Sequence, residues 1–132
     1  AETAEKFGKE QVHIWRRSYE VSPPNGESLK DVVSRVSPYF ENEIEPLIMD
    51  NKNILIAAHG NSLRAILIKV GLYKPEEISS IELPTGSPLC LEYDNGKLID
   101  NFYSVFFSPL FYINRREQNI SMLIALITFE RF

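Results

Sequence analysis

The chain has 132 residues, 44% of them hydrophobic, which is the size and composition of one ordinary domain with a packed core. The formal net charge of -4 comes from 18 acidic and 14 basic residues mixed along the sequence, so no basic stripe suggests a nucleic-acid partner. The one cysteine, Cys90, cannot form an internal disulfide, and no basic-then-apolar signal pattern opens the sequence; a cytoplasmic location is therefore expected.

The first predicted elements are helical and end at an arginine pair. Residues 1 to about 9 are good helix formers, and residues 11–19 carry aromatic side chains and Arg16-Arg17 into a turn. Residues 22–26, Ser-Pro-Pro-Asn-Gly, are a loop. The sequence starts within a helix, without an initiator methionine or a preceding strand. We therefore expect it to be the later part of a longer protein.

An amphipathic helix that packs on a sheet is predicted after this loop. Three glutamates between residues 41 and 45 fall largely away from its apolar face. Pro38 and Pro46 interrupt the pattern, and a kink is expected near Ser37-Pro38 because an interior proline removes a backbone hydrogen bond. The apolar face repeats at helical spacing through Leu29, Val32, Val33, Val36, Phe40, Ile44 and Leu47.

The most informative stretch joins a strand to a helix. Residues 54–58 are uninterrupted apolar residues, which indicates a strand covered on both faces. His59, Gly60 and Asn61 follow, and a helix is predicted from Asn61, as N-cap, to about Val70. Ligands of open α/β sheets bind at this edge, where the helix start offers unpaired N–H groups and a positive dipole end. The three residues are candidate binders of a phosphate; a hydrogen-bonded structural histidine is the alternative.

Later elements are shorter. A short helix is predicted at 75–78, and a loop at 84–86. Strands at 89–93 and 97–99 are joined by Asn95-Gly96, which predicts a type I′ hairpin. Cys90 falls within the first of these strands and is expected to be a buried, inert thiol. Two histidines and one cysteine at these separations predict no metal site.

The tail from Val105 onward differs from the rest. Residues 106–112 and 120–127 are strongly apolar, but 120–129 is too short for a membrane span, which needs about 20 residues. An added helix, a membrane-associating segment and a mistranslated end are the alternatives for this tail.

Four blocks of sequence occur in order along the chain: Ile14-Trp15-Arg16-Arg17-Ser18-Tyr19, Gly26-Glu27-Ser28-Leu29-Lys30-Asp31, Ala57-Ala58-His59-Gly60-Asn61-Ser62-Leu63-Arg64 and Leu83-Pro84-Thr85-Gly86. Together they resemble the cofactor-dependent phosphoglycerate mutases of the histidine phosphatase superfamily. The resemblance runs to about residue 103, so we divide the chain into the C-terminal part of such a domain, 1–103, and an atypical apolar tail, 104–132, whose ending we expect to be foreign to this family. The resemblance implies an α/β fold, a three-layer α/β/α sheet, here incomplete because the first strand and its arginine-histidine-glycine nucleophile motif are absent.

The resemblance also implies roles. His59 would stabilise the transition state of phosphoryl transfer without itself being phosphorylated, and Gly60 and Asn61 would contact the same phosphate. Arg16 and Arg17 would bind the phosphoglycerate, although on residue type alone a solvated basic pair is the commoner reading. The Thr85-Gly86 loop would lie near the phosphate, with the glycine serving a turn. Glu27-Ser28 resembles a substrate loop, and Ser28 equally suits a helix cap.

The implied parent is an isomerase of glycolysis and gluconeogenesis. It would interconvert 3-phosphoglycerate and 2-phosphoglycerate through a phosphohistidine, with 2,3-bisphosphoglycerate as phosphoryl primer and no metal. The 132 residues alone are expected to be inactive, because the phosphoryl-accepting histidine is missing. A histidine-type phosphatase is the enzymatic alternative, and a non-catalytic fragment that binds phosphate or other chains is the second.

The expected partners are small-molecule phosphoglycerates, with no nucleic acid and no membrane. A homo-oligomer is left open, and contacts known from longer family members are not assumed. A sheet edge exposed where the first strand belongs would favour aggregation or pairing with another chain.

Overall fold

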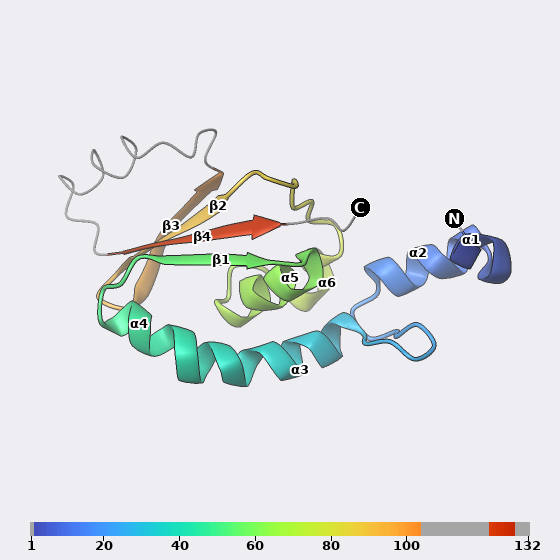
Figure 1. The fold of residues 1–132 in the computed structure, drawn as a ribbon, viewed down its shortest axis with the longest axis horizontal. Helices are drawn as coiled ribbons and strands as arrows, with labels where there is room; N and C mark the ends of the chain where they lie inside the picture. Colours follow the sequence, from blue (N-terminus) through green and yellow to red (C-terminus); the bar gives the residue numbers. More distant parts are fainter. Residues whose placement is uncertain (1, 104–121, 129–132) are drawn as a thin grey trace.

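The computed structural model describes residues 2–103 and 122–128. A small sheet has helices gathered against one face, and two short helices stand apart at one end (Figure 1). In chain order the elements are α1 (Glu2–Phe7), α2 (Lys9–Arg17), α3 (Leu29–Tyr39), the π-helix η1 (Phe40–Ile44), α4 (Glu45–Met49), β1 (Ile54–Ala58), α5 (Gly60–Lys69), α6 (Pro75–Ile78), β2 (Leu89–Asp94), β3 (Lys97–Tyr103) and β4 (Met122–Thr128).

The described strands form one mixed sheet in the order β1-β4-β2-β3. β4 runs parallel to β1 and antiparallel to β2. β2 and β3 form the predicted hairpin, whose turn residues Asn95 and Gly96 have φ values of 48° and 74°. Positive φ at both positions is what a type I′ turn requires, so the hairpin prediction is confirmed. β3 continues to Tyr103, beyond its predicted end at Ile99.

The predicted α/β fold class is confirmed, as an incomplete fold of mixed helices and strands with one small sheet. α3 packs along α5, which lies on the sheet (Figure 1). The core joins these helices to β1 and β2, and its largest fully buried side chains are Leu63, Leu67, Ile78 and Leu91. Cys90 is also buried, as predicted.

The predicted covering of β1 on both faces is wrong for the described residues. Ile54 is buried, whereas Leu55 is 58% exposed and Ala57 is exposed too. Successive residues of a strand point to opposite faces, and the described helices lie against only one of them (Figure 1). The uninterrupted apolar sequence of β1 predicted that both faces of the strand are buried. Among the described residues, only the face toward the helices is covered.

The predicted amphipathic helix is present, but it contains a π turn. Helical structure continues from α3 through η1 to α4, and η1 lies between Pro38 and Pro46. A π turn inserts one residue into the helix, so the apolar face moves by one position. Leu47, predicted to face the core, is 41% exposed, while Ile48 is 4% exposed. α3 continues through Pro38 to Tyr39 and the π segment begins at Phe40, so the kink expected near Ser37-Pro38 stays a prediction.

α3 begins at a capping box that stabilises its first turn. The Ser28 hydroxyl accepts a hydrogen bond from the Asp31 N–H at 3.2 Å, and the Asp31 carboxylate accepts one from the Ser28 N–H at 2.9 Å. The Ser28 hydroxyl also donates to that carboxylate at 2.6 Å. These hydrogen bonds from Ser28 hold the pKa of Asp31 below its ordinary value. The cap interpretation of Ser28 is therefore confirmed.

The described part of the tail is a strand. Met122–Thr128 forms β4, in the interior of the sheet between β1 and β2, so these residues are not the added helix that was one alternative. The apolar segment at 106–112 lies outside the described residues, and the division at residue 103 stays a prediction. None of the helices in the described ranges combines the length and apolar character needed to cross a bilayer.

The register shift at the π turn predicts opposite outcomes for two neighbouring alanine variants. Ile48→Ala removes a buried side chain and should lower the free energy of unfolding by about 2–5 kcal/mol. Leu47→Ala should lower it by less than about 1 kcal/mol. Urea unfolding followed by circular dichroism measures both. A larger loss in Leu47→Ala would show that the helix keeps α-helical register through η1.

Loss of the α3 cap should destabilise the protein in a pH-dependent way. Ser28→Ala should cost about 1 kcal/mol near neutral pH. Ser34→Ala removes an exposed hydroxyl that donates to the Lys30 carbonyl within α3 but caps no helix end, and it should cost less. A lowered carboxyl pKa contributes stability above the unfolded value, and this contribution is lost as pH falls through the folded value. The difference between wild type and Ser28→Ala should therefore shrink on acidification. Parallel stability curves for the two proteins down to acidic pH would contradict the assignment.

Candidate phosphate-binding edge

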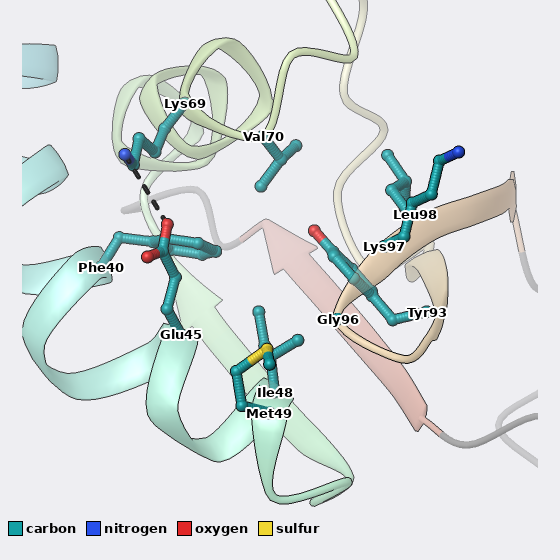
Figure 2. A pocket seen from close by; sticks show the side chains of 10 residues that line it. All are labelled: Phe40, Glu45, Ile48, Met49, Lys69, Val70, Tyr93, Gly96, Lys97 and Leu98. Carbon is teal, nitrogen blue, oxygen red and sulfur yellow. Dashed lines mark ion pairs between the residues drawn. The ribbon is translucent and has the colours of Figure 1, made fainter.

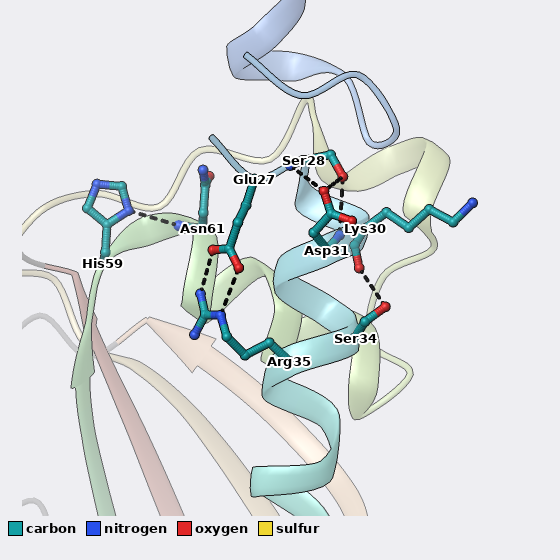
Figure 3. A network of polar contacts seen from close by, with 8 residues as sticks. All are labelled: Glu27, Ser28, Lys30, Asp31, Ser34, Arg35, His59 and Asn61. Atoms are coloured by element: carbon teal, nitrogen blue, oxygen red, sulfur yellow. Dashed lines mark hydrogen bonds and ion pairs between the residues drawn. The ribbon is translucent and has the colours of Figure 1, made fainter. Parts of the chain in front are cut away.

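The junction between β1 and α5 is built around His59. β1 ends at Ala58, and His59 has extended backbone with φ -66° and ψ 148°, so it is the N-cap of a helix that starts at Gly60. The ring Nδ1 accepts a hydrogen bond from the Asn61 N–H at 3.4 Å (Figure 3). Asn61 was predicted to be the N-cap, and this is wrong. The imidazole turns back over the first turn and takes the capping role, so the helix starts one residue earlier.

This contact determines which nitrogen of His59 can serve a ligand. Because Nδ1 accepts from the helix, the proton of the neutral ring is on Nε2. The His59 side chain is exposed at the carboxyl end of β1. Its Nε2–H is therefore a donor at the start of α5, beside the orphan N–H groups and the positive end of the helix dipole. The structural and ligand-binding interpretations of His59 are compatible, because they use different ring nitrogens.

Gly60 and Asn61 occupy the first turn of α5. Gly60 is buried and Asn61 is partly buried. The Asn61 side-chain oxygen accepts a hydrogen bond from Arg64 Nη1 at 3.4 Å. With its oxygen engaged by a cation, the Asn61 amide can offer its NH₂ group to an anion.

Arg64 is a positioning residue that the sequence analysis did not single out. Besides Asn61 it contacts the loop before β2, since Nη2 donates to the Ile81 carbonyl at 3.1 Å. The same loop is held from β3, where the Tyr103 hydroxyl donates to the Glu82 carbonyl at 3.2 Å. The sequence did contain a signal for this role: Arg64 follows Asn61 by three residues, about one helical turn, so the two side chains lie on the same side of α5. Its charge also adds a cation close to this edge.

The Thr85-Gly86 segment forms a turn, as predicted. The Ser87 N–H donates to the Pro84 carbonyl at 3.3 Å, and Gly86 has a φ of 72°. Positive φ at the third residue of such a turn favours glycine. No described contact joins this turn to His59, and its closeness to a phosphate stays a prediction.

Glu27 is neutralised by an ion pair. Arg35 donates to its carboxylate twice, from Nε at 3.0 Å and from Nη2 at 2.9 Å. The Arg35 guanidinium holds the pKa of the Glu27 carboxyl below its ordinary value, chiefly through the hydrogen bond. Figure 3 shows this pair in the same region as the capped starts of α3 and α5. A carboxylate near an anion site would repel phosphate, and pairing with Arg35 offsets that charge.

α2 ends at Arg16 and Arg17, but the structure describes only the backbone of these two residues. The backbone brings the end of α2 to the start of α3, since the Lys30 N–H donates to the Tyr19 carbonyl at 2.9 Å. α3 in turn packs along α5. The backbone contacts do not place the two arginine side chains near His59. Binding of the same phosphoglycerate by Arg16, Arg17 and His59 therefore stays a prediction. His13 is exposed on α2 and is given no role.

A cavity of about 520 Å³ lies at the other end of α5 (Figure 2). Lys69 lines it and is paired with Glu45 at 3.6 Å and with Glu41, and the pairing with Glu41 raises the pKa of Lys69. Tyr93 also lines it, and burial, with the nearby Glu45, raises the pKa of this phenol to about 12. The cavity is one helix length, about 15 Å, from His59, and its lysine on α5 is already neutralised. It is a poor candidate for a phosphate.

Metal binding has no support at either place. Within residues 2–103 and 122–128, no group of three or more His, Cys, Asp or Glu is placed to hold an ion. The prediction of a metal-independent site is not tested by this observation.

Comparison with known proteins identifies the family. A profile of the histidine phosphatase superfamily (branch 1) matches residues 1–101. A 2,3-bisphosphoglycerate-dependent phosphoglycerate mutase of Chlamydia muridarum (strain MoPn / Nigg) is 52% identical over 96 residues, which are 73% of this chain and 42% of the relative. The enzyme of that name from Gloeothece citriformis (strain PCC 7424) is 50% identical over 101 residues, 76% of this chain and 43% of the relative.

These relatives carry the name of an isomerase, and the chain spans about two fifths of their length, as the covered shares of 42% and 43% show. The matched segment contains all the predicted site residues, Arg16, Arg17, His59, Gly60 and Asn61. The chain therefore belongs to the histidine phosphatase superfamily, with relatives named 2,3-bisphosphoglycerate-dependent phosphoglycerate mutase.

Proposed function

We propose that the edge formed by His59, Gly60 and Asn61 binds the phosphate of a phosphoglycerate. The protein to which these residues belong would interconvert 3-phosphoglycerate and 2-phosphoglycerate through a phosphohistidine. The observation that carries the proposal is the capping geometry of His59, which leaves Nε2–H as a donor at the amino end of α5. Relatives at about half identity carry the matching enzyme name.

Phosphoryl transfer places charge on the equatorial oxygens of the transferring group, and donors fixed in advance stabilise it. Three kinds of donor are available at the amino end of α5: first-turn backbone N–H groups, the Asn61 amide and His59 Nε2–H, which lies on the side of the ring away from the Asn61 N–H (Figure 3). Arg64 contributes further positive charge behind Asn61. His59 then acts as a donor to the phosphate, not as the group that accepts it.

The proposed primer, 2,3-bisphosphoglycerate, supplies the phosphoryl group when bound. The described donors suit one of its phosphates, at His59 and the first turn of α5. Its other charged groups need further cations, and Arg16 and Arg17 are the proposed binders, since α2 ends where α3 begins. No metal enters the proposal.

The 132 residues alone are proposed to bind phosphate without turnover. The sequence has two histidines: His59 is engaged through Nδ1, and His13 is exposed on α2. A non-catalytic phosphate binder is therefore the second candidate. It is favoured by β4, because a segment beyond the family match fills the interior of the sheet.

Binding at this edge should depend on the His59 ring and not on its capping role. His59→Asn keeps a good N-cap but removes the Nε2–H donor, and should weaken binding of inorganic phosphate and 3-phosphoglycerate about tenfold, the value of one charge-assisted hydrogen bond. His13→Asn is the matched control and should leave binding unchanged. NMR titration of backbone amides measures both affinities. Equal affinities for wild type and His59→Asn would remove His59 from the site.

Turnover gives a separate test. The purified chain should produce no 2-phosphoglycerate from 3-phosphoglycerate with 2,3-bisphosphoglycerate present, as followed by ³¹P NMR. The physical reason is the lack of a histidine placed to accept the phosphoryl group. Turnover that disappears in His59→Asn would show that these residues hold a complete catalytic site.

A further inference from the structure

Two family-matched strands of the sheet are separated by a gap of one strand. Among the described strands, β1 pairs with β4 alone, while β2 pairs with β3 and β4. β1 and β2 therefore lie about 10 Å apart, two strand spacings, without bonding to each other. Each would present an unpaired row of N–H and C=O groups if β4 were removed.

The strand in this gap comes from outside the family match. The superfamily profile ends at residue 101, and β4 begins at Met122. β1 and β2, which border the gap, lie inside the match. The strands that border the gap thus belong to the family-matched sequence, whereas the strand that fills it does not. More than half of each compared relative also lies outside the matched region.

We propose that the gap between β1 and β2 is a strand-acceptor site. In this chain its own segment Met122–Thr128 fills the site, in place of a strand that the longer relatives supply from outside the matched region. The site takes an extended apolar segment that runs parallel to β1 and antiparallel to β2.

The residues around the gap explain why the site takes an extended apolar segment. Ile54, Leu89 and Leu91 border the gap and are buried in the core. An interior strand must satisfy backbone groups on both edges, so it excludes proline and disfavours charge. Met122–Thr128, with the sequence MLIALIT, contains neither and is rich in strand-forming residues. It pairs over five positions on each side: Ile124–Thr128 with Ile54–Ala58, and Met122–Leu126 with Leu89–Tyr93.

A single substitution tests the register, because Cys90 and Ala125 are directly opposite each other across β2 and β4. Cys90 is the one cysteine of the sequence and is 3% exposed. Directly opposed positions have Cβ atoms about 4.5–5.5 Å apart, close to disulfide geometry. Diamide treatment of the full chain carrying Ala125→Cys should therefore form an intramolecular disulfide, with the two thiol hydrogens passing to diamide.

Ile124→Cys is the matched control. Position 124 is opposite Leu91, and neighbouring positions of a strand face opposite sides of the sheet, so this variant should keep both thiols. Intact mass and non-reducing electrophoresis should show a cross-linked monomer for Ala125→Cys alone. A disulfide-linked dimer would overturn occupancy by the same chain, since the tail would then fill a second copy. Equal reaction of the two variants, or reaction of neither, would overturn the proposed register.

Hydrogen exchange of the unsubstituted chain tests the proposal without any variant. Amides of Met122–Thr128 should exchange as slowly as those of Leu89–Asp94, because β4 is bonded along both edges. Fast exchange at 122–128 beside slow exchange in β2 would also overturn the proposal.

Discussion

The hydrogen bond between the Asn61 N–H and His59 Nδ1 lies where β1 turns into α5. The core depends on this turn, because α5 supplies the buried Leu63 and Leu67. The proposed phosphate site depends on it as well, since one ring nitrogen of His59 accepts from the helix start and the other is left facing outward. A single side chain therefore couples the packing of α5 to the presentation of a donor.

The two ends of α5 have opposite electrostatic character. At the amino end, N–H groups, His59 and Arg64 present donors and positive charge. At the carboxyl end, Lys69 interacts favourably with the helix dipole but is matched by Glu41 and Glu45. An anion is attracted to the first end, whereas at the second end the lysine of α5 is already matched by two glutamates. The cavity is thus a less suitable phosphate site than the exposed edge.

Features controlled by neighbouring residues could be predicted from the sequence. Asn95-Gly96 gave the hairpin, and the strand ending at His59 gave the candidate edge. Features that depend on distant residues could not. Because of the π turn, Ile48 is buried in place of Leu47. The spacing of apolar residues in a regular α-helix does not predict this change. The role of Met122–Thr128 depends on pairing with strands more than 25 residues away, as the registers with Leu89–Tyr93 show, whereas an apolar run by itself fits a strand, a helix or a membrane segment.

The position of a bound anion tests the central claim most directly. A crystal structure of the chain soaked in phosphate should place the anion within hydrogen-bonding distance of His59 Nε2 and the first-turn N–H groups of α5. His59 Nδ1 should remain on the Asn61 N–H in that structure. Phosphate bound instead in the cavity at Lys69 and Lys97, with none at His59, would contradict the account.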